Sequence, residues 1–235
     1  MKISIIGAGR AGGSLGIYFK NKGLDVLGYY SKSFEHAKEA SKNVGGTPFL
    51  TLEDSLCADI IILAVPDDLI EKISDEISKY NIKGKHIIHL SGACSSKSLY
   101  ACKNKGAKTY SLHPPLSFST KKTIVDEITF AFEGEDLEEL KDFFDEHEIK
   151  YIIIKEENKP LYHAAAVMAS NYITSLLHSS FKMLLECGFT LKDAQSFFAP
   201  LIYSAVNNTI EKGSSNAITG PIARGDINTL SLHLD

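Results

Sequence analysis

The chain has 235 residues, 44% of them hydrophobic, which is enough for one large domain or two smaller ones with a true core. Its net charge of -4 and its lack of a long basic run give no electrostatic reason to expect nucleic acid or a membrane surface. The short apolar start is neither a signal peptide nor a membrane span, so we expect a cytoplasmic protein. The four cysteines form no C-x-x-C pair, and no metal site is expected. The expected partner is therefore a small molecule.

Strands and helices alternate as far as residue 154. In chain order, hydrophobic periodicity and capping residues predict strand 2–6, helix 11–22, strand 25–30, helix 33–43, strand 58–66, helix 67–77, strand 85–90, helix 95–106, strands 108–112 and 128–132, helix 137–146 and strand 150–154. The continuous apolar run at 58–66 is typical of a central parallel strand that is covered on both faces. The alternation indicates an α/β fold with a doubly wound Rossmann sheet.

The pattern changes after residue 154. The predicted elements are a long helix at 158–188, a helix at 190–213 that Pro200 breaks or kinks, and a loop with one short helix at 214–235. We therefore expect a dinucleotide-binding domain at 1–155 and a smaller all-α domain at 156–235. About 80 residues are few for a core of their own, so helices packed across a homodimer are expected.

A glycine motif follows the first strand. Residues 7–12 read GAGRAG, a G-x-G-x-x-G turn between an apolar strand and an amphipathic helix. Gly7 permits the tight turn, Gly9 lets the backbone approach a pyrophosphate, and Gly12 lets helix and strand pack closely. The N-terminus of the helix favours bound anions. This context predicts a dinucleotide site.

The end of the second strand indicates which dinucleotide. NAD sites usually have an acidic residue there, whereas this chain has Ser31, Lys32 and Ser33, which suit a 2′-phosphate. NADP (as NADPH) is therefore expected rather than NAD. The alternative is that Lys32 is an ordinary solvated lysine and Ser33 only a helix cap. The remaining residues assigned to the cofactor site are Arg10, which either adds a cation near phosphate or points to solvent, Ala11, Val65 and Pro66.

Several segments together resemble a known family. They are residues 7–12, 64–68, 89–93, 111–118, 162–172 and 217–226. They are similar to predicted NADP oxidoreductases with a Rossmann domain and a 6-phosphogluconate-dehydrogenase-like helical domain, some of which look like an alternative type of ketopantoate reductase. The resemblance implies an NADP-dependent oxidoreductase that reduces a small 2-keto acid, with 2-dehydropantoate (ketopantoate) as the first candidate. It also implies a C-terminus longer than one that ends at residue 235 within the final helix.

More distant relatives by architecture are pyrroline-5-carboxylate reductase and the β-hydroxyacid dehydrogenases. The latter place a catalytic lysine four residues before an asparagine on the long helix. With Asn171 as that asparagine, Val167 stands at the lysine position, and Lys159 lies twelve residues away, about three turns. Another group, or water, must therefore protonate the product.

His163 is the first candidate for this acid, because an imidazole exchanges protons near neutral pH. Ser170 and Asn171, seven and eight residues further on, are expected on the same side of a regular helix. The alternative for His163 is a core histidine with structural polar neighbours. His113 follows a strand. The alternatives for this residue are that it binds substrate, that it shares in proton transfer, or that it only stabilises a loop.

Substrate-binding candidates come from two other segments, Ser91 with Gly92 and Arg224 with Asp226. Ser91 and Gly92 follow a strand and could hold a carboxylate, and Asp67 is expected to cap a helix. Arg224 suits bidentate carboxylate binding. Its alternative is an ion pair with Asp226, which is also expected to cap the last helix.

Two other functions stay open at this point. An imine reductase similar to pyrroline-5-carboxylate reductase needs less help from an acid, because its substrate is already protonated. A non-catalytic NADP-binding sensor would bind the cofactor without turnover.

Overall fold

The computed structural model describes residues 1–232 and divides the chain into two compact units, Met1–Ser170 and Asn171–Asp235. The domain boundary predicted at residue 155 stays a prediction. The expected end of the final helix, at residues 233–235, lies outside the described residues.

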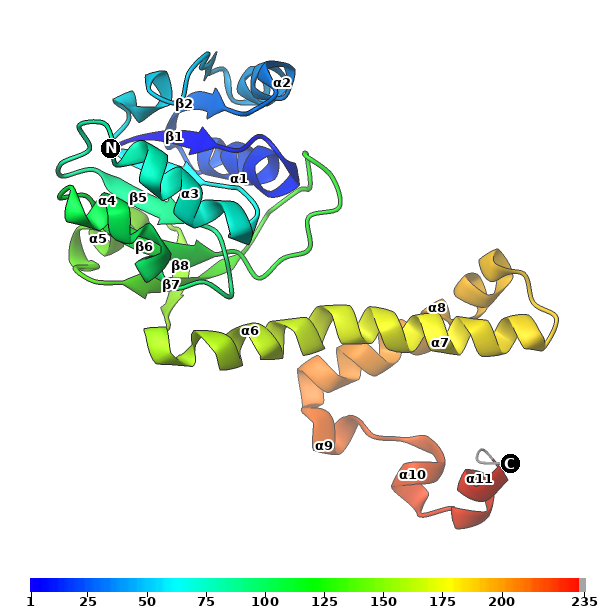
Figure 1. Ribbon diagram of the computed structural model, residues 1–235. Coiled ribbons are helices and arrows are strands. Elements are labelled where there is room, and N and C mark those ends of the chain that lie inside the picture. Colours follow the sequence, from blue (N-terminus) through cyan, green and yellow to red (C-terminus); the bar gives the residue numbers. More distant parts are fainter. Residues whose placement is uncertain (233–235) are drawn as a thin grey trace. The chain divides into compact units, whose positions relative to one another are not determined.

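The first unit is built on one sheet (Figure 1). Its strands in the described residues have the order β3-β2-β1-β4-β5-β6-β7-β8. Every neighbouring pair is parallel except β6 and β7, which are antiparallel. The strands are β1 (Lys2–Ile6), β2 (Asp25–Tyr30), β3 (Thr47–Pro48), β4 (Ile60–Leu63), β5 (His86–His89), β6 (Lys108–His113), β7 (Thr129–Gly134) and β8 (Lys150–Ile153). The strand order reverses between β1 and β4, and this switch point is where ligands bind in such sheets.

Both faces of the sheet are covered. The side chains of the apolar strand β4 demonstrate this, because they are divided between two buried clusters. Ile60 and Ile62 belong to one buried cluster, whereas Ile61 and Leu63 belong to another. Because side chains alternate along a strand, the two clusters lie on opposite faces. The first contains residues of α1 (Arg10–Asn21), α2 (Phe34–Val44) and α5 (Glu138–Glu146), and the second contains residues of η1 (Asp54–Cys57), α3 (Asp67–Ile77), η2 (Ser96–Leu99) and α4 (Tyr100–Asn104). The doubly wound α/β fold predicted from the sequence is confirmed.

Local signals fix the ends of the elements in this unit. Helix α2 begins after Ser33 and ends at Gly45, which is left-handed with φ 70°. The two-residue strand β3 was not predicted, because its short segment carries no alternating apolar pattern.

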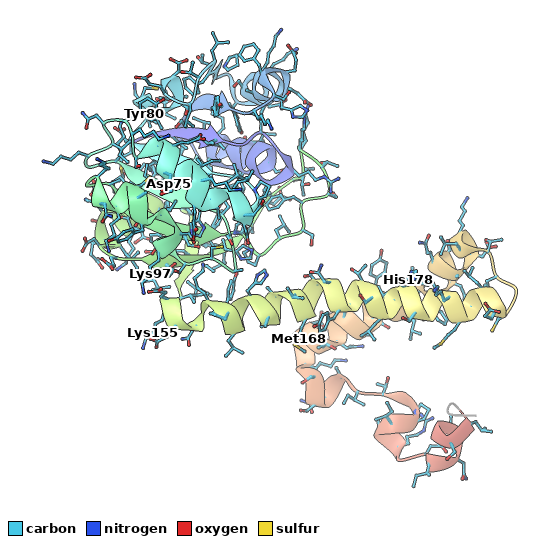
Figure 2. All side chains as sticks on the ribbon, viewed as in Figure 1. Asp75, Tyr80, Lys97, Lys155, Met168 and His178 are labelled. Atoms are coloured by element: carbon cyan, nitrogen blue, oxygen red, sulfur yellow. The ribbon has the colours of Figure 1, made fainter. Side chains whose placement is uncertain are left out.

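The long helix predicted at 158–188 contains an interruption. It begins with η3 (Glu156–Asn158) and α6 (Lys159–Val167), widens into a π-helical turn (Met168–Tyr172) and continues as α7 (Ile173–Glu186). Met168, in the turn, and His178, in α7, mark this helix in Figure 2. A π turn adds a residue to the repeat, so the regular spacing assumed from His163 to Ser170 does not apply across it.

The second unit consists of helices. Helix α8 (Leu191–Lys212) begins at Thr190, whose side chain accepts a hydrogen bond from the backbone N of Asp193 at 3.2 Å, and it continues through Pro200. The prediction of one short helix after residue 213 is wrong, because the described residues form α9 (Ser214–Ala217), α10 (Gly220–Arg224) and α11 (Ile227–Leu232). Glycines separate these helices: Gly213, Gly220 and Gly225 all have positive φ.

The second unit has little core of its own. Among its described side chains, Ala194 is the only buried hydrophobic one. Large apolar side chains are exposed along its helices, including Leu176 at 70%, Met183 at 69%, Tyr203 at 68% and Ile210 at 77%. Within residues 1–232, no helix has both the length and the apolar character needed to cross a membrane.

Candidate functional site

Four segments of the first unit follow the carboxyl ends of adjacent parallel strands. They are the glycine turn after β1, Val65 and Pro66 after β4, the turn at Ser91 after β5, and His113 at the end of β6. Parallel strands bring their carboxyl ends to one edge of a sheet. The residues that carry the chemistry of this unit are therefore expected at that edge.

The three glycines of the turn have different surroundings. Gly7 has φ 108°, and a Cβ added to it would lie 2.2 Å from the carbonyl oxygen of Ala64. A Cβ on Gly12 would lie 2.1 Å from the carbonyl oxygen of Gly7. Around Gly9, by contrast, no described atom outside Gly9 and its two chain neighbours lies within 4 Å of such a Cβ. Gly7 and Gly12 are therefore required by packing, whereas Gly9 faces open space, as an approaching pyrophosphate would need.

The helix that follows presents its N-terminus without a protein cap. Gly9 is the N-cap residue of α1 and supplies no side-chain hydrogen bond. Arg10 is exposed and forms no ion pair with any described residue, and Ala11 is half-buried. The first N–H groups of α1 thus have no side-chain acceptor at the cap, which suits an anion.

The end of β2 lies beside the glycine turn, since the backbone N of Gly7 donates to the carbonyl of Tyr30 at 2.8 Å. Ser31, Lys32 and Ser33 follow directly. Lys32 is exposed, and Ser33 is the N-cap residue of α2 but makes no capping hydrogen bond with its side chain. The hydroxyl of Ser33 therefore does not make the helix-capping hydrogen bond that the alternative interpretation of this residue expects.

Strand β4 contributes Val65 and Pro66 to the same edge. A Cβ on Gly7 would lie 3.2 Å from Cγ1 of Val65, so this side chain lies against the turn, and Pro66 is the N-cap residue of α3. The prediction that Asp67 caps this helix is wrong. This residue is the first of α3, and its carboxylate accepts a hydrogen bond from the hydroxyl of Ser91 at 2.8 Å.

His89 stabilises the turn that follows β5. Its Nδ1 accepts from the backbone N of Ser91 at 3.2 Å, and its Nε2 lies 3.0 Å from the carbonyl of Ser95. Because Nδ1 is an acceptor, the proton is assigned to Nε2, which donates to that carbonyl. Burial lowers the pKa of His89 to about 4, so the ring is neutral at pH 7.

Ser91 lies at the centre of this turn. Its hydroxyl donates to Asp67 and accepts from the backbone N of Ala93 and of Cys94, at 3.2 and 3.0 Å. The substrate-binding role predicted for Ser91 stays a prediction. A ligand would have to replace one of these bonds.

A buried lysine contacts the turn that follows β5. Lys159, the first residue of α6, is only 2% exposed. Its Nζ donates to the hydroxyl of Ser111 at 2.6 Å and to the carbonyl of Ser91 at 3.4 Å, and Ser111 in turn donates to that carbonyl at 3.1 Å. Burial lowers the pKa of Lys159, while the nearby Glu133, together with Cys94 and Asp67, acts in the opposite direction.

Two histidines meet above Gly92. The ring centroids of His113 and His163 are 6.4 Å apart, and a Cβ on Gly92 would lie 2.9 Å from Nε2 of His113 and from Nδ1 of His163. This Nδ1 is buried and has no hydrogen-bond partner among the described residues. The structure therefore brings together three of the predicted residues, His113, His163 and Gly92.

Tyr162 completes this cluster. Its hydroxyl lies 2.6 Å from Nδ1 of His113. Burial lowers the pKa of His113 to about 4, with Lys159 and His163 acting in the same direction and Asp67 opposing them, and burial raises the pKa of Tyr162. Tyr162 therefore keeps its proton. We assign its hydroxyl as the hydrogen-bond donor to Nδ1, which places the ring proton of neutral His113 on Nε2, the nitrogen beside Gly92.

Three other predicted residues belong to the helices that follow His163 in the chain. Ser170 donates to the carbonyl of Ala166 at 2.7 Å, within the first unit. Asn171 and Arg224 are exposed residues of the second unit. The catalytic and substrate-binding roles predicted for these three residues stay predictions.

Asp226 has the capping role that was expected for it. It accepts from the backbone N of Thr229 at 3.1 Å and from its hydroxyl at 2.7 Å, which lowers the pKa of the Asp226 carboxyl. The alternative ion pair with Arg224 does not form among the described residues. Among residues 1–232, which the structure describes, no three His, Cys, Asp or Glu side chains cluster as potential metal ligands.

Sequence reasoning did not assign Lys159, Tyr162 or Ser111 to the site. A lysine is usually exposed, and Lys159 was considered only as a catalytic acid at the wrong distance from Asn171. The one available signal was position, because Ser111 belongs to the same strand as His113.

Comparisons with known proteins agree with this fold. Residues 1–114 match a Rossmann-like domain, and residues 128–235 match a domain of unknown function, DUF2520. The N-terminal fold is Rossmann-like. No curated protein matches the chain.

Solved structures show a similar fold over nearly the whole chain. A protein from Thermotoga maritima is 25% identical, with a TM-score of 0.76, and the match covers 98% of this chain and 87% of that one. A candidate NADP oxidoreductase from Bacteroides fragilis is 21% identical, with a TM-score of 0.76 and coverages of 99% and 89%. A pyrroline-5-carboxylate reductase from Coxiella burnetii is 14% identical, with a TM-score of 0.71 and coverages of 99% and 91%.

Proposed function

We propose that this chain is a cytoplasmic NADPH-dependent oxidoreductase that reduces the carbonyl of a small 2-keto acid. The observation that carries the proposal is the hydrogen bond between Tyr162 of α6 and His113, which ends β6 at the same sheet edge as the glycine turn. The glycine turn would bind the dinucleotide and His113 would donate the proton, both within the first unit.

The cofactor would be held by the glycine turn and the end of β2. Gly9 leaves room for the pyrophosphate at the N-terminus of α1, and Lys32 with Ser33 would bind the 2′-phosphate. Bound NADPH supplies the hydride. The fold supports this assignment, since structures with it include a pyrroline carboxylate reductase from Plasmodium falciparum with NADP bound, 16% identical with a TM-score of 0.66.

The chain's own residues would supply the proton. Nε2 of His113 would donate its proton to the oxygen of the reduced carbonyl. Tyr162 would pass its proton to Nδ1 in the same step, and solvent would restore the tyrosine. His163 would contact the same oxygen through Nδ1, which lies as close to the Cβ position of Gly92 as Nε2 of His113 does.

This proton donor favours a carbonyl over an imine. A protonated imine needs no acid from the protein, whereas reduction of a keto acid leaves an alkoxide that does. Among 2-keto acids, 2-dehydropantoate is the first candidate, because the sequence resembles the alternative ketopantoate reductases.

A substrate panel tests the proposal. Purified protein would be given NADPH or NADH with 2-dehydropantoate, other 2-keto acids and cyclic imines, and oxidation of the cofactor would be followed at 340 nm. We expect turnover with keto acids and a preference for NADPH that Lys32→Ala reduces about tenfold. Lys38→Ala, on the exposed side of α2, is the matched control. Cofactor binding without turnover on any substrate would show a sensor instead, and turnover restricted to imines would show an imine reductase.

We also propose that a second copy of the chain covers the exposed apolar side chains of α7 and α8. Leu176 and Met183 on α7 are 70% and 69% exposed, and one unit of this size cannot bury them by itself. Light scattering should give twice the chain mass of 25.8 kDa. Replacing both residues with lysine should give monomers, whereas Leu50→Lys, at a residue 74% exposed in the first unit, should not.

A further inference from the structure

Lys159 places an ammonium group where the protein interior gives it little water. The side chain is 2% exposed, and its Nζ has hydrogen-bond acceptors on two separate segments, the carbonyl of Ser91 after β5 and the hydroxyl of Ser111 in β6. Lys159 itself begins α6. One nitrogen atom thus connects α6, β6 and the turn that follows β5.

Stability alone does not explain a charge at this position. Removing an ammonium from water is costly, and an apolar side chain of similar volume is often as stable or more stable at a buried site. A methionine would have a similar length and no desolvation cost. What it could not do is donate hydrogen bonds to Ser91 and Ser111.

These bonds fix the peptide that precedes Gly92. The hydroxyl of Ser91 donates to Asp67, and its carbonyl accepts from Lys159 and Ser111, so the residue is held on one side by a carboxylate and on the other by a cation. Gly92 follows immediately in the chain. The ring nitrogens of the two histidines lie against this glycine.

We propose that Lys159 is a positioning residue of the reductase site, whose ammonium holds the Ser91–Gly92 turn in place against His113 and His163. The part of the inference that concerns catalysis rests on the proposed function. The contact geometry that it describes does not depend on turnover.

The charge of Lys159 has a second effect on the site. The groups that face His113 are Lys159, Tyr162 and His163 from α6 and Asp67 from α3. The ammonium disfavours a proton on His113, which keeps Nδ1 free to accept the hydrogen bond from Tyr162. Removal of the charge should therefore raise the pKa of His113.

An NMR titration of the substrate-free protein tests both effects. In the wild type the His113 ring should titrate near pH 4. In Lys159→Met its pKa should rise, and the amide signal of Gly92 should move. Lys159→Arg should keep the pKa near 4, because it keeps the charge. Lys155→Met, at an exposed lysine four residues earlier (Figure 2), should change neither signal.

Kinetics provide the second measurement. With a substrate found in the panel, Lys159→Met should lower kcat about tenfold and move the acid limb of the pH profile upward, with the Kd for NADPH within twofold of wild type. If Lys159→Met does not fold, Lys159→Gln takes its place. An unchanged His113 pKa and an unchanged Gly92 signal in a folded neutral variant would overturn the inference. A wild type without turnover would refute the proposed function, while the titration would still decide the role of Lys159.

Discussion

A Cβ added to Gly92 would lie 2.9 Å from Nδ1 of His163, closer than side chains approach one another in proteins, and equally close to Nε2 of His113. Gly92 does not have a positive φ, so the backbone itself would accept another residue. The glycine is needed here for space. It leaves room beside two ring nitrogens that the proposed reaction uses.

Gly92→Ala should therefore fold but lose activity. The added methyl group would push both imidazole rings aside, and we expect kcat to fall about 100-fold, the scale of a lost acid catalyst, while the Kd for NADPH stays within twofold. Ala93→Ser, at the exposed neighbouring residue, should behave as wild type. Full turnover by Gly92→Ala would show that the rings are not part of the reaction.

Tyr162→Phe should separate proton delivery from binding. The variant loses the hydroxyl that lies 2.6 Å from Nδ1 of His113, so the ring no longer has its proton source. We expect kcat to fall about 100-fold and the free energy of unfolding by about 1 kcal/mol, with KM for both substrates little changed. Steady-state kinetics and urea unfolding measure these quantities. Tyr80→Phe is the matched control, and equal turnover in the two variants would exclude Tyr162 from the relay.

The sequence was sufficient for the parts of the site that are local. The glycine turn, the end of β2 and the cap at Asp226 each depend on residues within a few positions of one another, and their turn chemistry is visible in the chain, whereas the cap expected at Asp67 was wrong. The alternation of strands and helices likewise predicted the doubly wound sheet.

The rest depends on contacts between distant residues. Tyr162 is 49 residues from His113, and Lys159 is 68 residues from Ser91, so no local pattern brings them together. The π-helical turn at Met168–Tyr172 has no sequence signal that we could use, and it removed the regular spacing on which the shared face of His163 and Ser170 was predicted.

Two glycines of the turn should respond differently to the same substitution. Gly9 has φ -79° and open space around it, so Gly9→Ala should fold normally and raise the Kd for NADPH at least about tenfold by blocking the pyrophosphate. Gly12→Ala would place a methyl group 2.1 Å from the carbonyl oxygen of Gly7 and should lose about 1 to 3 kcal/mol of stability or more. Fluorescence titration with NADPH and urea unfolding distinguish the two effects. Wild-type affinity in Gly9→Ala would contradict a pyrophosphate at this turn.

Stability should fall in mild acid because of His89. Its pKa is about 4 in the folded chain and 6.5 ordinarily, so the unfolded chain binds more protons between these values. The contribution of His89 to the free energy of unfolding, about 3 kcal/mol, should therefore be fully present above pH 6.5 and decrease as the pH falls toward 4. His113, whose pKa is also lowered to about 4, acts in the same direction.

Urea unfolding at pH 7, 6, 5 and 4.5 measures this dependence. His89→Gln should be less stable than wild type at pH 7, because the hydrogen bonds to Ser91 and Ser95 are disturbed, but its stability should change less between pH 7 and 4.5. His36→Gln, at an exposed histidine of α2, should keep the wild-type slope. The same slope in His89→Gln and in wild type would mean that His89 is not the group that titrates, and the decrease would then have to come from His113 or from His86, whose pKa burial also lowers.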